Sequence, residues 1–213
     1  MKTYDYLNGT KIYLYQDSSM FRVNTDTTLL GHFYQLNENE SILDIGTNNG
    51  ALLLFKKETN AYFYAIDILD EAIKLAKENF FINGMDVHTE ISSVQDFQHE
   101  PFDVIVCNPP YFKGDLVNKN SLLKNQRHQL SLSLCELMLH VKRLLKSNGR
   151  FYLVHRASYL NDICTELVKH KMRIKTLQFL YDDHKDRAIS VLMEIVFSET
   201  IEINVLKPIY NKR

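Results

Sequence analysis

The sequence predicts an α/β protein with a mostly parallel sheet, helices on both faces and an antiparallel hairpin at one edge. Apolar segments of strand length alternate with segments whose apolar residues recur at helical spacing, the pattern of βαβ units. Near the C-terminus, a short polar turn separates two strand-like segments. Such a turn joins antiparallel strands, because parallel neighbours need a longer crossover. The 213 residues, 45% of them hydrophobic, are enough for one domain with a sizeable core.

Seven segments are expected to be strands, because each is a short apolar run bounded by polar or glycine-containing turns. The expected strands are 41–45, 61–67, 87–92, 102–107, 151–154, 176–181 and 188–197.

Four segments are expected to be helices, because their apolar residues form one stripe. Asp70 is placed to cap the second helix, which ends at Gly84. Asn148 and Gly149 end the third. The expected helices are 51–57, 70–83, 130–145 and 159–170.

Composition and cysteine usage favour a cytoplasmic protein. No apolar run approaches the roughly 18 residues of a membrane span, and residues 1–17 lack the pattern of a signal peptide. Cys107, Cys135 and Cys164 are odd in number and far apart, which predicts reduced, mostly buried thiols and neither a disulfide framework nor a metal site. Nothing implies an oligomeric partner, so we expect a monomer.

The net charge of −1 hides an asymmetry along the chain. Residues 1–112 carry 7 lysines and arginines against 16 acidic residues, whereas residues 113–175 carry 13 against 4. A basic block of this kind indicates a surface that faces a polyanion, although solvated helix faces would give the same composition. Residues 112–128 are polar and lack periodicity, which indicates a flexible loop, either an RNA clamp or an ordinary surface loop. The candidate RNA contacts are Lys113, Lys119, Lys124, Arg127, His128 and Arg156.

Polar and small residues follow three of the predicted strands, where an open α/β sheet binds its ligands. Gly46 and Gly50 follow the first strand and would let a ligand approach the backbone, although many strand-to-helix turns look alike. Asp67 ends the second strand, 23 positions after Asp44, and is placed to accept both ribose hydroxyls of a nucleoside; a helix-capping role is the alternative. Asp96 follows the third strand and could bind an adenine amino group, with Phe97 beside the ring.

The fourth strand ends in Asn108-Pro109-Pro110-Tyr111, which suits methylation of a planar, amide-like nitrogen. Such a nitrogen is a poor nucleophile, so a site must hold its N–H groups with acceptors and direct its lone pair at the methyl donor. The Asn108 side-chain oxygen and the Pro109 carbonyl can accept side by side. Both prolines fix φ and donate nothing, and Tyr111 offers a face for stacking. An ordinary proline-rich turn is the bland alternative.

Together these motifs resemble those of S-adenosylmethionine-dependent methyltransferases with an Asn-Pro-Pro-Tyr motif. Within that group the chain looks most like the tRNA1(Val) adenine N6-methyltransferases, which modify the adenosine just 3′ of the anticodon. The closer resemblance covers nearly the whole chain. It rests on Phe21-Arg22-Val23-Asn24-Thr25-Asp26-Thr27-Thr28-Leu29-Leu30, residues 76–83, Arg127-His128, Val154-His155-Arg156 and Leu206-Lys207-Pro208-Ile209-Tyr210.

The resemblance implies a single Rossmann-like class I methyltransferase domain with a seven-stranded sheet. It implies S-adenosylmethionine as cofactor, tRNA as partner and residues 1–38 as an N-terminal extension covering the cofactor site. Thr25-Asp26 would lie over the cofactor's methionine end, and Asn108 to Tyr111 would hold the target base. Asn48 departs from the family, which usually has glycine there, but asparagine tolerates positive φ better than other residues. The implied cofactor contacts are Asp26, Asp44, Gly46, Asn48, Gly50, Asp67, Asp96 and Asn108.

Other functions remain compatible with these residues. The same tetrapeptide fits methylation of guanine N2 in ribosomal RNA, of N6 in a DNA adenine, or of a protein glutamine side chain. A non-catalytic RNA- or cofactor-binding relative is a further alternative, favoured only by Asn48. The main expectation is transfer of a methyl group to adenine N6 in tRNA.

Overall fold

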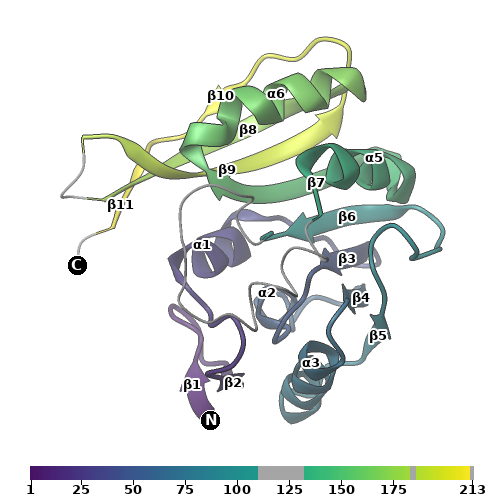
Figure 1. The fold of residues 1–213 in the computed structure, drawn as a ribbon, viewed down its shortest axis with the longest axis vertical. Coiled ribbons are helices and arrows are strands. Elements are labelled where there is room, and N and C mark those ends of the chain that lie inside the picture. Colours follow the sequence, from purple (N-terminus) through teal and green to yellow (C-terminus); the bar gives the residue numbers. More distant parts are fainter. Residues whose placement is uncertain (110–131, 183–185, 212–213) are drawn as a thin grey trace.

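The computed structural model describes residues 1–109, 132–182 and 186–211, and one sheet of nine strands forms its centre (Figure 1). The sheet runs in the order β5-β4-β3-β6-β7-β9-β8, and the two short strands β10 and β11 both pair with β8. Its strands are β3 (Ser41–Ile45), β4 (Tyr62–Asp67), β5 (Val87–Ile91), β6 (Phe102–Cys107), β7 (Leu145–Arg156), β8 (Met172–Asp182), β9 (Ala188–Phe197), β10 (Asn204–Val205) and β11 (Ile209–Asn211).

The predicted mostly parallel sheet with an antiparallel edge hairpin is confirmed. Strand β9 runs antiparallel to both β7 and β8, and all other neighbouring strands of this sheet are parallel. Each of the seven expected strands is present. The two additional strands come from the C-terminal segment, which pairs parallel with β8 over two and three residues; stretches this short give no sequence signal.

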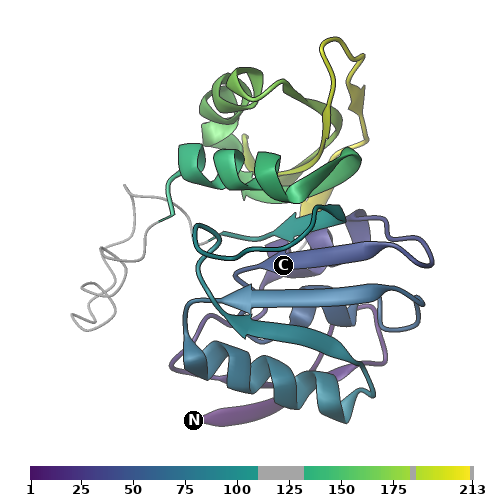
Figure 2. The ribbon, with the colours of Figure 1, turned by 90° about the vertical axis from the view of Figure 1, so that its right-hand side faces the viewer.

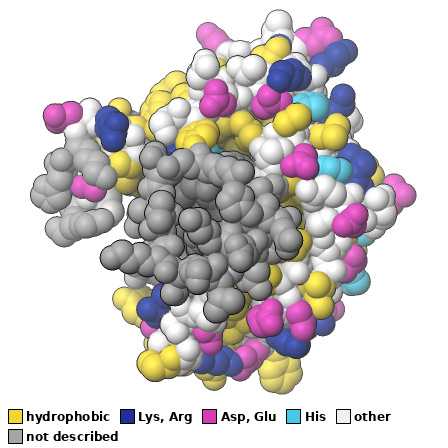
Figure 3. Space-filling model, in the orientation of Figure 1, with side chains coloured by type: hydrophobic (Ala, Val, Ile, Leu, Met, Phe, Trp, Pro, Cys, Tyr) yellow, Lys and Arg dark blue, Asp and Glu magenta, His cyan; other side chains and the backbone are white. Residues whose placement is uncertain are grey.

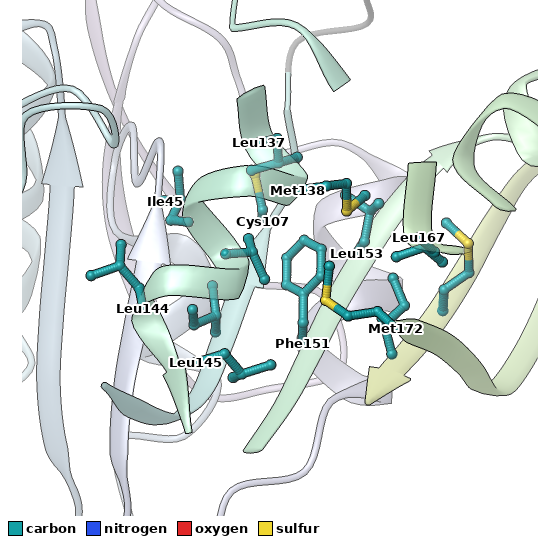
Figure 4. Packing of buried hydrophobic residues seen from close by; sticks show 14 of the residues in the cluster. Ile45, Cys107, Leu137, Met138, Leu144, Leu145, Phe151, Leu153, Leu167 and Met172 are labelled. Carbon is teal, nitrogen blue, oxygen red and sulfur yellow. The ribbon is translucent and has the colours of Figure 1, made fainter. Parts of the chain in front are cut away.

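The sheet is covered on both faces, as expected. Helices α1 (Thr25–Phe33), α2 (Ala51–Leu54) and α3 (Asp70–Ile82) contribute to one buried cluster, and α5 (Leu134–Leu144) and α6 (Leu160–Lys169) contribute to the other. In both Figure 1 and Figure 2, α5 and α6 lie in the upper part of the molecule and α3 lies in its lower part. Figure 4 shows Leu137 and Met138 of α5 beside Phe151 and Leu153 of β7.

Three residues that were expected to mark helix ends have other roles, although the helices begin or end close to the predicted positions. Leu69 occupies the N-cap of α3 without a side-chain cap, and Asp70 instead lies in the first turn, where it accepts a hydrogen bond from Lys74. Helix α5 ends directly before Leu145, where β7 begins, so Asn148 and Gly149 lie inside a strand. An irregularity in the pairing of β6 with β7 accommodates them, because the register shifts between Phe102 and Val104.

The N-terminus forms a structure that hydrophobic periodicity did not indicate. Strands β1 (Lys2–Tyr6) and β2 (Tyr13–Asp17) pair as a separate antiparallel hairpin. Leu14 on the inner face of β2 is fully buried, so the hairpin shares the core beneath α1, α2 and α3.

Cys107 is buried, Cys164 half-buried and Cys135 exposed, so only part of the expectation for the thiols holds. Across residues 1–109, 132–182 and 186–211, no helix has the length and apolar character needed to cross a membrane. The same ranges contain no cluster of three histidine, cysteine, aspartate or glutamate residues arranged to hold a metal ion.

Candidate active site

The candidate site lies where the sheet reverses its strand order. From β3 the chain continues to β4 and β5 on one side, whereas β6 pairs with β3 on the other side. In this register Ile45 pairs with both Ile66 and Cys107, so the turns after β3, β4 and β6 leave neighbouring strand ends. Ligands of open α/β sheets bind outside the carboxyl ends of strands at such a switch point.

The turn after β3 is built from residues with left-handed backbone. Gly46, Asn48 and Gly50 have φ of 73°, 52° and 80°. The expectation that Asn48 would adopt positive φ is therefore confirmed, and the turn is kept despite the missing glycine. A Cβ atom on Gly46 would meet nothing within 4 Å, which leaves room for a ligand, whereas one on Gly50 would lie 2.6 Å from the Phe80 ring. Packing against α3 therefore requires Gly50.

Two polar atoms beneath this turn are buried without a partner in the described part of the chain. Asp44 is fully buried, and its Oδ2 atom accepts a hydrogen bond of 2.7 Å from the Thr47 hydroxyl, but Oδ1 has no such bond. Nδ2 of Asn49 is also unsatisfied. Burial raises the pKa of Asp44 to about 7, with a further contribution from the negative charge of Asp67. Unsatisfied buried groups are costly, so one free acceptor and one free donor here fit a polar ligand.

Asp67 lies at the end of β4, as predicted, and is 9% exposed. Its Oδ2 atom accepts the backbone N–H of Asn48 at 2.9 Å, and Oδ1 accepts that of Leu69 at 3.0 Å. The pKa of Asp67 is raised, because the effect of burial exceeds the opposite effect of these hydrogen bonds. Each carboxylate oxygen has a second lone pair, so both remain able to accept from a diol.

Asp96 is exposed, and its carboxylate accepts a 2.6 Å hydrogen bond from Ser93 at the start of the same turn. Phe97 is 1% exposed and belongs to the core, with its ring stacked over those of His99 and Phe102. Its ring is thus packed in the core next to Asp96, and a place beside an adenine ring stays a prediction.

Asn108 directly follows β6, and its amide reaches across to helix α1. The Asn108 Nδ2 atom donates a 3.0 Å hydrogen bond to the Thr27 hydroxyl. The Oδ1 atom makes no hydrogen bond to the parts of the chain that the structure describes. Pro109 is buried. Pro110 and Tyr111 lie outside the described residues.

Asp26 lies one position before Thr27 in the first turn of α1 and is 9% exposed. Burial raises its pKa, opposed by a hydrogen bond from Ser190 and by the positive charge of Arg156. Arg156 and Ser190 are register partners on β7 and β9. Arg156, a candidate RNA contact, is thus half-buried beside a carboxylate at the edge of the candidate site.

The segment before α1 is attached to the turn after β3. The Asn48 side chain donates a hydrogen bond to the Phe21 carbonyl, and the Val23 N–H donates to Oε1 of Gln16 at 2.7 Å. The Asn48 contact and the one between Thr27 and Asn108 join the N-terminal segment to two turns of the site, and the Gln16 contact joins it to β2.

Several basic side chains of residues 113–175 make hydrogen bonds or ion pairs within the fold. Lys113, Lys119, Lys124, Arg127 and His128 lie outside the described residues. Among the described ones, Arg143 donates to the carbonyls of Val94 and Phe97, and other pairs join Lys146 to Asp103, Arg150 to Glu40 and Lys175 to Glu194. On the face in Figure 3, basic side chains alternate with acidic and hydrophobic ones.

Sequence reasoning missed the roles of Asn24, Thr27 and Ser190. Asn24 followed three residues later by Thr27 fits a helix N-terminus, which could have been recognised. The contacts of Thr27 with Asn108 and of Ser190 with Asp26 span 81 and 164 positions, and local patterns carry no signal for such pairs.

Comparison with known proteins gives concordant results. The profile of a family described as a methyltransferase domain matches residues 36–194. A tRNA1(Val) (adenine(37)-N6)-methyltransferase of Shewanella sediminis is 31% identical over 173 residues, which are 76% of this chain and 71% of the relative. A protein of the same name from Dyadobacter fermentans is 29% identical over 207 residues, 92% of this chain and 85% of the relative.

Solved structures share the fold. The ribosomal protein L11 methylase of Lactobacillus delbrueckii subsp. bulgaricus aligns with a TM-score of 0.62 at 22% identity, covering 85% of this chain and 83% of that one. The tRNA (uracil-54, C5)-methyltransferase of Pyrococcus abyssi, in complex with S-adenosyl-L-homocysteine, aligns with a TM-score of 0.64 at 18% identity, covering 92% and 44%.

Proposed function

The chain belongs to the family of tRNA1(Val) (adenine(37)-N6)-methyltransferases, and we propose that it methylates N6 of the adenosine just 3′ of the anticodon in a valine tRNA. It is an S-adenosylmethionine-dependent enzyme of tRNA adenine N6 methylation. The observation that carries the proposal is the Asn108 amide at the switch point, whose nitrogen donates to Thr27 and whose oxygen has no hydrogen bond to residues 1–109, 132–182 or 186–211.

The residues of the turn after β3 fit the cofactor. Open space over Gly46, the free Oδ1 atom of buried Asp44 and the free donor of Asn49 form a polar cradle. Asp67 would accept the ribose hydroxyls, and Asp44 would face a positively charged part of the donor. When bound, S-adenosylmethionine supplies a methyl group that is already activated by the sulfonium, so the protein mainly has to position the acceptor.

The protein would hold N6 of the target adenine, which receives the methyl group, with hydrogen-bond acceptors. Oδ1 of Asn108 and the carbonyl of Pro109 would each accept one N6 hydrogen, which directs the nitrogen lone pair toward the methyl group. Tyr111 would stack on the base, a role that rests on its place in the motif. The base must leave its stack in the anticodon loop to reach this position, and the basic residues 113–128 and Arg156 would contact the tRNA backbone.

The direct test is methylation of tRNA that lacks its own modifications. Purified protein is incubated with S-adenosylmethionine and each candidate tRNA, and the nucleosides are identified by mass spectrometry after digestion. N6-methyladenosine confined to a valine tRNA is the expected product. Cofactor binding without that product would move the activity to another acceptor, and loss of both would indicate a non-catalytic relative.

A further inference from the structure

The amide of Asn108 has two ends of nearly equal size and opposite hydrogen-bonding character. If Oδ1 faces the target base, it accepts an N6 hydrogen; if Nδ2 faces the base, two donors oppose each other. Shape alone does not distinguish the ends, so the surrounding hydrogen bonds must decide which one faces the base.

The decisive group is a backbone N–H at the start of α1. The N–H of Thr27 can only donate, and it lies 2.9 Å from Oδ1 of Asn24, which fixes the orientation of the Asn24 amide. The Thr27 hydroxyl lies 3.0 Å from the same oxygen. Two acceptors at that distance would repel, so the hydroxyl must donate to Asn24.

A threonine hydroxyl carries one hydrogen, and Asn24 receives it. Thr27 Oγ1 therefore offers only lone pairs to Asn108, 3.0 Å away. Asn108 must meet it with Nδ2, which turns Oδ1 away from α1.

We propose that Asn24 and Thr27 are positioning residues, which through this chain of hydrogen bonds hold Oδ1 of Asn108 toward the acceptor nitrogen. The inference rests on the proposed function and deepens it, because the fixed polarity selects an acceptor that carries N–H groups. An exocyclic amino group satisfies Oδ1 of Asn108, whereas a ring carbonyl at the same place, as in inosine, is repelled by it.

Substitutions of Thr27 separate the hydroxyl from the volume of the side chain. Thr27→Val keeps the shape and removes the hydroxyl, whereas Thr27→Ser keeps the hydroxyl. We expect Thr27→Val to lower kcat about fivefold or more, the factor associated with one ordinary hydrogen bond, with cofactor affinity and KM for tRNA nearly unchanged. Thr27→Ser should stay within about twofold of the wild type. Equal kcat for Thr27→Val and the wild type would overturn the proposal.

Asn24 provides a second test, because its contact with Asn108 runs through Thr27. Glycine is tolerated at an N-cap nearly as well as asparagine, so Asn24→Gly removes the acceptor with little loss of helix stability. We expect Asn24→Gly to lower kcat and Asn24→Asp, which keeps the acceptors, to preserve it. Equal effects of the two variants would indicate that the cap merely supports α1 and would contradict the proposal.

A carboxylate at position 108 has two equivalent ends and needs no orientation. In an Asn108→Asp background, the fall in kcat caused by Thr27→Val should therefore shrink or vanish; an undiminished fall would contradict orientation as the cause. Wild-type turnover is measured alongside by detection of N6-methyladenosine. An inactive wild type would refute the proposed function itself, whereas an active wild type with an equally active Thr27→Val variant would refute only the positioning role.

Discussion

Asn79 and Tyr15 exchange two hydrogen bonds, so the side chain of Asn79 pairs with the backbone of β2 as a neighbouring strand would. Oδ1 accepts the Tyr15 N–H at 2.6 Å, and Nδ2 donates to the Tyr15 carbonyl at 2.9 Å. Nδ2 also donates to the carbonyl of Asn49 at 2.9 Å. One fully buried amide on α3 thus joins the N-terminal hairpin to the cofactor turn.

Replacement of Asn79 by alanine should therefore affect stability and cofactor binding together. Three hydrogen bonds are removed and backbone groups around them are left unpaired, so we expect the free energy of unfolding to fall by about 3 kcal/mol. Urea unfolding and calorimetric titration with S-adenosylmethionine measure the two effects. The matched control is Asn83→Ala, which removes bonds from a less buried amide to the Tyr13 and Asn79 carbonyls and should cost about 1 kcal/mol. Comparable losses in both variants would contradict the linking role of Asn79.

The sequence predicted those features that depend on local pattern. Hydrophobic periodicity and turn residues were sufficient to predict the seven long strands and the antiparallel edge. Asp44, Asp67 and Asn108 were predicted as site residues from their positions at or near the ends of predicted strands. The hairpin was not predicted because polar residues (Thr3, Asp5 and Gln16) lie on its covered face and tyrosines on its exposed face, so apolar and polar residues do not alternate as in an ordinary half-buried strand. The roles of Asn79 and Thr27 depend on partners 64 and 81 positions away, which only the tertiary fold brings together.

Asn108→Ala should separate chemistry from cofactor binding. The substitution removes the Asn108 oxygen that would accept a hydrogen bond from adenine N6. It leaves the turn after β3 and the polar atoms of Asp44 and Asp67 in place. We expect methyl transfer to become undetectable and the dissociation constant for S-adenosylmethionine to change less than about threefold, well below the effect of losing a buried hydrogen bond to charge. Single-turnover assays and calorimetry test this directly. Substantial transfer by the variant would show that another group holds the acceptor nitrogen.

Asn48 should tether the segment before α1 to the cofactor turn. Asn48→Gly keeps a residue that adopts positive φ freely but removes the hydrogen bond to the Phe21 carbonyl. We expect little change in stability and faster amide hydrogen exchange at positions 20–22. Asn48→Ala removes the same tether and adds about 1 kcal/mol of left-handed strain, so it should be less stable than Asn48→Gly. Unchanged exchange in both variants would leave the Gln16 contact as the one that holds the segment.

Binding of tRNA should weaken steeply as salt rises, because phosphate contacts release counterions. Combined replacement of Lys113, Lys119 and Lys124 by glutamine should reduce the slope of log affinity against log salt by roughly 0.7–0.9 for each phosphate that is no longer neutralised. Lys175→Gln is the control, since that ammonium pairs with Glu194 at 2.9 Å. Filter binding across a salt series provides the slopes. A slope that the triple replacement leaves intact would exclude these lysines as partners of the tRNA phosphates.

Asp44 should make stability fall as pH rises through the range below 7. Its pKa is raised by burial to about 7 in the folded protein, against 3.8 for an ordinary aspartate. Between these values the folded state binds more protons than the unfolded state, so each pH unit lowers the contribution of Asp44 by about 1.4 kcal/mol, and the contribution is constant above 7.

Asp44→Asn removes this dependence, so its unfolding free energy relative to the wild type should rise by about 2 kcal/mol from pH 5.5 to pH 8. Asp103→Asn is the control and should change stability by the same amount at every pH in this range. Burial raises the pKa of Asp103, but hydrogen bonds from Lys146 and Ser41 outweigh burial, so the net pKa is lowered and the carboxylate is ionised throughout. Wild-type affinity for the cationic donor should increase between pH 6 and pH 8 as Asp44 ionises, and Asp44→Asn should lose that increase. Parallel stability curves for Asp44→Asn and the wild type would show that Asp44 does not titrate near neutrality, and the free acceptor beneath the cofactor turn would then be a permanent anion.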